Sequence, residues 1–167
     1  MNPTETVEEY YEALRRGEPL SPYFAEREDA VKFGVSERLA GYEAISEGLR
    51  EQTRTTEDWR VESRNLGVVV RDSVAWFTDD VALSWTASEG ADSEAEQETR
   101  YSFDTRWSGV LERESSDDES SSGKSSSGKS SSGESNSDES SSGKSSGDSE
   151  EPRWRFVQMH VSAPHEL

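Results

Sequence analysis

The sequence contains no cysteine and few apolar side chains. Without thiols the chain forms neither disulfides nor thiolate metal sites, which is typical of an intracellular protein. Apolar residues make up 29% of the chain, and no uninterrupted apolar run reaches the ~18 residues that indicate a membrane span. The N-terminus also lacks the basic and apolar stretches of a signal peptide. We therefore expect a cytoplasmic protein that does not contact a membrane.

Lysine is scarce as well. Of 18 basic residues only four are lysines (Lys32, Lys124, Lys129 and Lys144), and 36 residues are Asp or Glu, so the formal net charge is −18. Acid-rich, lysine-poor surfaces suit proteins that work in molar salt, where the Debye length is about 3 Å and self-repulsion is screened. The composition indicates a halophile's protein, with an ordinary acidic protein as the alternative. The same charge opposes binding to nucleic acid, which is a polyanion.

Apolar residues are absent altogether from residues 115–151. This segment contains 19 Ser, 5 Gly, 9 Asp or Glu, 3 Lys and Asn136. A segment without apolar side chains has nothing to bury against the entropy cost of ordering it. We therefore predict a disordered Ser/Gly/acidic insertion in a single domain that comprises residues 1–114 and 152–167.

One stretch of this segment imitates a nucleotide-binding motif. Residues 123–130 read GKSSSGKS and match the phosphate-loop pattern G-x-x-x-x-G-K-S/T letter for letter. A working phosphate loop joins a buried strand to the start of a helix, so that backbone N–H groups and the helix dipole converge on the phosphate. Only polar residues flank the match, so no buried strand precedes it and no helix follows it. The match arises from the repeat of SSSG followed by Lys or Glu. We expect no nucleotide binding here, and the sequence indicates no cofactor.

The first part of the remaining sequence has the spacing of helices and a short strand. A capping-box sequence at residues 2–5 starts a helix that Gly17 ends. A short turn begins at residues 21–22, and alternation predicts a strand over 30–35. Apolar residues at helical intervals predict a second helix over 41–54.

The second part alternates in the manner of strands. Alternating apolar and polar side chains predict strands over residues 74–87, 98–114 and 153–164. The stretch 58–72 before them leads into a turn at Asp72 and Ser73. The 115–151 segment separates the last two of these strands, so it lies where a hairpin would turn. Closing a loop of this length instead of a short turn costs only about 2 kcal/mol more in entropy.

Two details of the strands bear on function. We interpret Asp79 and Asp80 as a turn or bulge between strand segments. In the last strand, strict alternation places His160 on the same face as Trp154 and Phe156. His160 would then face an apolar interior.

Four stretches resemble the SnoaL-like domains of the nuclear transport factor 2-like (ketosteroid isomerase-like) superfamily. They are GYEAISEGL (41–49), SVAWFTDD (73–80), RWSGVLER (106–113) and WRFVQMHVSAP (154–164), and they occur in the family's order. The departure is the 115–151 segment, where the family has a turn of a few residues. Together with the acidic composition, these stretches resemble a haloarchaeal member.

The resemblance implies an α+β fold in which a cone-shaped, curved antiparallel sheet wraps two or three N-terminal helices and leaves a pocket at its wide end. It also implies a homodimer through the sheet. Members include isomerases, cyclases, hydrolases and proteins without known activity, so the fold does not assign a reaction.

The residues that we expect to line the pocket are Tyr11, Trp76, Trp85, Arg106 and His160. Aromatic walls suit a flat ligand, although such rings also simply fill a tapered core. His160 could be a general base or hydrogen-bond donor, or it could only hold the last strand in place. Arg106 could bind an anionic ligand or pair with a neighbouring carboxylate.

Other chemistry finds little support. No carboxylate stands alone in an apolar stretch as an obvious general base, and Asp104, the nearest candidate, has Arg100 and Arg106 beside it. Two histidines without cysteine give no metal-ligand spacing, so we expect no metal site.

Three functions therefore stay open. The first is a protein of unassigned activity that binds a small apolar or aromatic molecule in its pocket. The second is an isomerase or cyclase that transfers a proton with His160 as base, and the third is a dimeric protein-interaction scaffold. An open pocket of about 300 Å³ that both His160 and Arg106 line would favour binding or catalysis. A filled cone would favour the scaffold.

Overall fold

The structure is a computed structural model that describes residues 1–88, 98–115 and 152–165. Apart from Ser115, the predicted insertion lies outside the described residues, as does the phosphate-loop match at 123–130. The division of the chain into one domain and a disordered insertion therefore stays a prediction.

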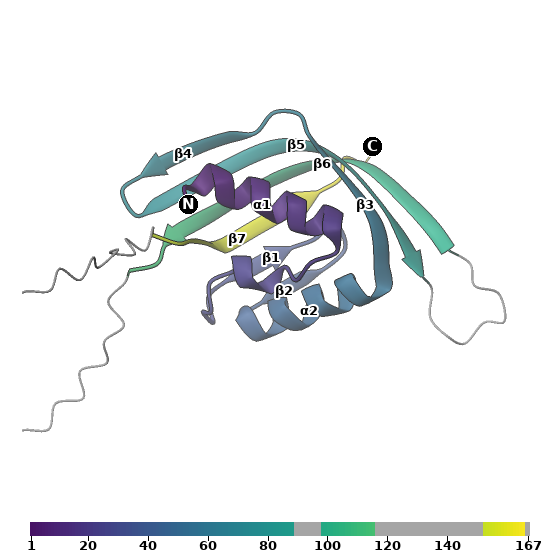
Figure 1. Ribbon diagram of the computed structural model, residues 1–167, viewed down its shortest axis with the longest axis horizontal. Coiled ribbons are helices and arrows are strands. Elements are labelled where there is room, and N and C mark those ends of the chain that lie inside the picture. The colour runs from purple at the N-terminus through teal and green to yellow at the C-terminus, as the bar shows by residue number, and fades with distance from the viewer. Residues whose placement is uncertain (89–97, 116–151, 166–167) are drawn as a thin grey trace, which may run out of the picture.

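The described residues form two α-helices, one 3₁₀ turn and seven strands. In chain order these are α1 (Pro3–Arg16), η1 (Ser21–Tyr23), β1 (Val31–Phe33), β2 (Arg38–Ala40), α2 (Tyr42–Thr55), β3 (Thr56–Ser63), β4 (Gly67–Arg71), β5 (Val74–Ser88), β6 (Glu98–Arg113) and β7 (Trp154–Ser162). Figure 1 shows both helices on one side of the sheet, with α1 along the long strands and α2 beside β1 and β2. This is the expected α+β cone, a layer of helices on one sheet.

Helix α1 begins and ends where the sequence predicts. The Asn2 side chain accepts from the Glu5 N–H and the Glu5 carboxylate accepts from the Asn2 N–H, each at 2.9 Å, which completes the capping box. At the other end Gly17 adopts a left-handed φ of 65°, a conformation that glycine takes without strain. The helix buries one face, including Val7, Tyr10 and Leu14, against the sheet.

The sheet is mixed, which corrects the antiparallel sheet implied by the family resemblance. Its strand order is β2-β1-β7-β6-β5-β3, and β4 pairs with the first part of β5. Strand β1 pairs in parallel with β7, whereas the long strands β5, β6 and β7 are antiparallel neighbours. Strand β1 also pairs antiparallel with β2, and its other edge joins β7.

Aromatic rings fill the narrow part of the core. Tyr10 is buried and makes edge-on contacts with Phe24, Trp107 and Phe156, at ring-centroid distances of 6.0, 6.2 and 5.5 Å. Edge-on contacts of this kind stabilise a core beyond the apolar area that they bury.

Within the described ranges, no helix is long and apolar enough to cross a membrane.

The strands on either side of the 116–151 segment pair with each other. Residues of β6 from Arg106 to Arg113 lie opposite β7, and the Glu114 N–H donates to the Arg153 carbonyl at 2.8 Å beyond the strand ends. The two strand ends are therefore close enough for a short turn to join them. The expected hairpin arms are confirmed.

Replacing residues 116–151 by a turn of four to six residues should leave the domain folded. Because β6 and β7 pair outside this segment, the shorter loop should raise the free energy of unfolding by up to about 2 kcal/mol through reduced loop entropy. Thermal and urea unfolding in the same salt would measure the change. A loss of more than about 2 kcal/mol would show that the segment packs on the domain and would contradict the predicted insertion.

Candidate functional site

A cavity of about 340 Å³ lies between α2, the β1–β2 connection and the inner face of the sheet. Its sheet side is aromatic and apolar, and its loop and helix side is polar. The aromatic side chains that line it are Tyr10, Trp59, Trp85 and Trp107, and the polar ones include Lys32, Glu37, Glu51 and Gln52. A largely apolar cavity with a few polar groups can hold a small organic molecule.

Two stacked tryptophans form one wall of the cavity. Trp59 of β3 and Trp85 of β5 have ring centroids 4.8 Å apart and ring planes inclined by 17°. The Trp59 Nε1–H donates to Thr56 Oγ1 at 2.9 Å, which fixes the orientation of the indole. A flat apolar surface of this size suits an aromatic ligand.

A β-bulge directs Trp59 toward this wall. The register of β3 on β5 runs from Glu57 opposite Thr86 to Arg60 opposite Ser84, so Asp58 and Trp59 together face Trp85. Asp58 has a left-handed φ of 53°, the conformation of the first residue of a G1-type bulge, a position that glycine usually occupies. The sequence gives no clear sign of the bulge.

A buried lysine forms the polar side of the cavity. Lys32 of β1 is 5% exposed, and its Nζ lies 3.3 Å from Glu37 Oε1. Burial lowers the pKa of the Lys32 ammonium, and the nearby negative charge of Glu37 offsets part of this effect. Burial also raises the pKa of Tyr10, with a smaller contribution from Glu37. No local pattern in the sequence marks Lys32 or Glu37 as residues of a site.

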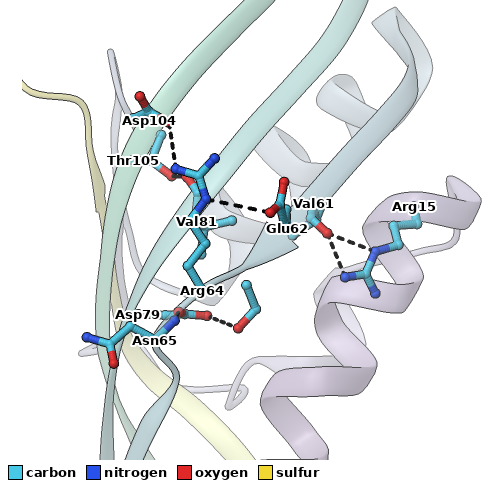
Figure 2. A network of polar contacts seen from close by, with 10 residues as sticks. Arg15, Val61, Glu62, Arg64, Asn65, Asp79, Val81, Asp104 and Thr105 are labelled. Carbon is cyan, nitrogen blue, oxygen red and sulfur yellow. Dashed lines mark hydrogen bonds and ion pairs between the residues drawn. The ribbon is translucent and has the colours of Figure 1, made fainter.

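A second polar cluster lies beneath α1 around Asp79, which is 4% exposed. Its carboxylate accepts from Tyr11 Oη at 3.0 Å, from Ser63 Oγ at 2.6 Å and from the Asn65 N–H at 2.9 Å. Figure 2 shows Asn65 beside Asp79, and Arg15 of α1 reaching the Val61 carbonyl on β3. The cluster fastens α1, β3 and β5 together.

This cluster corrects two expectations. Strand β5 runs unbroken through Asp79 and Asp80, so neither residue forms a turn or bulge. The isolated carboxylate that seemed to be missing is Asp79, whereas Asp104 is exposed and pairs with Arg64 at 3.1 Å (Figure 2). The signal was present in the sequence, because Asp79 alternates with Phe77 and Val81 on the buried face.

The structure places Trp85 on the cavity and the other expected aromatic residues elsewhere. Tyr11 is buried with its hydroxyl on Asp79 and is not among the residues that line the cavity. Burial, followed by the charge and hydrogen bond of Asp79, raises the pKa of Tyr11. Trp76 is 42% exposed on the outer face of β5, where Arg71 lies over its ring.

His160 and Arg106 come together, but on the outer face of the sheet. Both are exposed, and the antiparallel register places Ser108 opposite His160 and Arg106 opposite Ser162. They line a separate hollow of about 340 Å³. Its size and lining are those expected of a shared pocket, but it lies on the outer face and not inside the cone. The His160 ring also lies 5.4 Å from that of Phe33.

The expectation that His160 shares a face with Trp154 and Phe156 is wrong. The register of β7 on β6 shifts where Val110 lies opposite Gln158 and Leu111 opposite Phe156. This leaves Val157 as an extra residue, so the side chains that follow it change faces. Met159 is therefore buried where strict alternation would have placed His160.

The third hollow is a charged surface depression. It measures about 620 Å³ and is lined by Arg27, Glu112, Glu114 and Arg155, among others. These charges form ion pairs with one another, since Arg27 pairs with Glu112, and Arg155 with Glu114 at 3.2 Å.

Among the described residues no group of three or more His, Cys, Asp or Glu could hold a metal ion. The cavity behind Trp59 and Trp85 is thus the strongest candidate site.

Comparisons with known proteins agree with the fold. A family model described as a SnoaL-like domain matches residues 4–117. No curated protein matches the sequence.

Solved structures show the same architecture. A nuclear transport factor 2-like superfamily protein from Salmonella enterica serovar Typhimurium superposes with a TM-score of 0.60 at 15% identity, covering 98% of this chain and 89% of that one. A ketosteroid isomerase-like protein from Erwinia carotovora atroseptica gives 0.59 at 11% identity, covering 98% and 94%. A protein of unknown function from Pseudomonas putida gives 0.60 at 14% identity, covering 98% and 85%. Similarity at this level of identity shows the fold alone.

Proposed function

We propose that this chain, which belongs to the SnoaL-like domain family, binds a small apolar or aromatic molecule in the cavity between α2 and the inner face of the sheet. The observation that carries the proposal is a cavity of about 340 Å³ with Trp59, Trp85 and Trp107 in its lining. Small-molecule pockets start at about 300 Å³ and combine apolar walls with a few polar groups. Trp85 is the member of the expected set on which this proposal rests.

The geometry favours binding over the alternative of an isomerase or cyclase with His160 as base. Proton transfer to and from carbon needs a base that a closed site shields from water. His160 is exposed on the outer face and Arg106 is exposed beside it, so neither residue reaches the inner cavity. We assign no reaction to the protein.

Two further features belong to the same proposal. A homodimer through the outer face of the sheet is supported by the aromatic side chain of Trp76, which is 42% exposed there. A cytoplasmic, high-salt setting is supported by the formal charge of −18 and by the four lysines against fourteen arginines.

Titration with 2-naphthol, a neutral two-ring aromatic, tests the binding proposal. Strand β5 offers a matched pair, because Trp85 lines the cavity and Trp76 lies on the opposite face. Trp85→Leu should weaken binding about tenfold, since losing one aromatic contact costs up to about 1.5 kcal/mol. Trp76→Leu should change the dissociation constant less than twofold. Isothermal titration calorimetry measures both, with circular dichroism to check the fold.

Two results would contradict the proposal. One is the absence of 2-naphthol binding to the wild-type protein at millimolar concentration. The other is an equal loss of affinity in both variants, which would show that the ligand does not distinguish the cavity from the outer face.

A further inference from the structure

Lys32 stands apart from the other cations of the domain. It is the one lysine among the described residues, and the remaining cationic side chains in those ranges are arginines, apart from histidine. Lys32 lies on β1 opposite Met159 of β7, a core residue with no exposed surface, and its own side chain is 6% exposed. A lysine that served only solubility would lie at the surface. This lysine instead lines the aromatic cavity.

The surroundings of the Lys32 amine leave part of its bonding capacity unused. Within the described ranges its Nζ has one hydrogen-bond partner, Glu37 Oε1 at 3.3 Å, whereas an ammonium carries three N–H donors. The β1–β2 connection places the carboxylate, because the Gly34 N–H donates to the Glu37 carbonyl at 2.9 Å and the Glu37 side chain folds back over Gly34. Since Lys32 lines the cavity, a ligand there can contact its side chain.

The charges around the cavity decide which kind of ligand oxygen fits Lys32. Glu37 already balances the charge of Lys32, and Glu51 contributes a second carboxylate to the lining. Tyr10, which also faces the cavity, is neutral because burial raises its pKa. A ligand carboxylate would be repelled by both glutamates of the lining. A neutral carbonyl meets no such repulsion.

We propose that the cavity takes aromatic aldehydes or ketones and that Lys32 joins to their carbonyl carbon as an imine, an inference that rests on the proposed function. The Lys32 nitrogen forms a bond to the carbonyl carbon, and the oxygen takes up the electron pair and a proton. The carbon–oxygen bond then breaks, and the oxygen leaves as water with a second proton. Glu37 carries these protons between nitrogen and oxygen. Removal of a lysine amine from water activates it for this attack.

Reductive trapping in the intact wild-type chain tests the proposal. The protein is incubated at neutral pH with 2-naphthaldehyde and sodium cyanoborohydride, which converts an imine to a stable secondary amine, and the modified lysines are located by peptide mass spectrometry. Lys124, Lys129 and Lys144 serve as controls within the same molecule. Lys32 should be modified faster than any of them, because burial lowers the pKa of Lys32 and leaves more of its amine unprotonated at neutral pH.

The pH profile separates a reactive amine from one that is merely accessible. The rate at Lys32 should reach its plateau at lower pH than the rates at the other lysines, since burial lowers the pKa of Lys32. Glu37→Gln should lower the plateau rate at Lys32 several-fold, because the proton carrier is lost, and should move the plateau to still lower pH, because the charge of Glu37 raises the pKa of Lys32. The rates at the other three lysines should not change. Excess 2-naphthol should slow modification at Lys32 only.

Two outcomes overturn the imine and are distinguishable from failure of the binding proposal. If 2-naphthol binds the cavity but Lys32 reacts no faster than the other lysines, the imine is wrong and the binding site stands. If 2-naphthol does not bind and Lys32 is not modified, the proposed function fails and this inference fails with it.

Discussion

Replacing Asp79 by alanine is expected to lower the free energy of unfolding by about 4 kcal/mol. The substitution removes a buried acceptor that serves Tyr11 Oη, Ser63 Oγ and the Asn65 N–H. Tyr11 is 2% exposed, so its hydroxyl would lose its partner without gaining water. Asp79→Asn should cost less, about 1–2 kcal/mol, because the amide keeps one acceptor and hydroxyl groups can rotate to accept from its NH₂ group.

The neighbouring Asp80 provides the control. It is exposed on the outer face of the same strand, where its carboxylate accepts from Asn65 Nδ2 at 3.4 Å. Asp80→Ala should change stability by no more than about 0.5 kcal/mol. Urea unfolding at constant salt measures all three variants. If Asp79→Ala lies within about 1 kcal/mol of the wild type, the cluster does not hold α1 on the sheet as described.

Replacing Gly109 by alanine is expected to cost about 3 kcal/mol. A Cβ atom at this position would lie 2.5 Å from the Gln158 carbonyl oxygen and 2.6 Å from Cε1 of Phe77, which is 1% exposed. Neither neighbour can move away easily. The Gln158 carbonyl belongs to the backbone of β7 beside its bulge, and the Phe77 ring is packed in the core. The strands would have to separate where their register shifts.

A second glycine in a strand provides the control. It separates the steric clash at Gly109 from the general effect of replacing a strand glycine by alanine. Gly67 on β4 also pairs with β5, but the nearest atom to an added Cβ there is Thr78 Oγ1 at 3.8 Å. Gly67→Ala should be neutral within about 0.5 kcal/mol or slightly stabilising, since alanine reduces the entropy of the unfolded chain. If both substitutions lower the free energy of unfolding equally, the close approach of β7 and Phe77 to Gly109 is not the cause of the destabilisation. Thermal unfolding of the two variants decides this.

The fold was accessible from the sequence because its signals are local. The capping box at Asn2, the stop at Gly17 and the apolar stripe of α2 depend on residues a few positions apart. Alternation likewise identified β5 and β6, and it implied that β6 and β7 pair across the Ser-rich segment. Strand β2 was missed, since three residues carry too little alternation to be recognised.

The site was less accessible because bulges and long-range contacts determine it. One extra residue at Val157 moved His160 to the outer face, and a second bulge turned Trp59 toward Trp85. Neither bulge has a glycine to mark it. Lys32 joins the cavity through the parallel pairing of β1 with β7, a pairing that no local pattern indicates. Asp79 was different, because simple alternation along β5 would have placed it in the core.

The most direct test of the ligand cavity follows the indole N–H signals of the five tryptophans by NMR during the 2-naphthol titration. Trp59 and Trp85 stack on each other at the cavity, so their signals should shift together and saturate at one dissociation constant. Trp76 on the outer face and Trp154, buried outside the cavity lining, should not move. Shifts at Trp76 with unmoved signals at Trp59 and Trp85 would contradict the account.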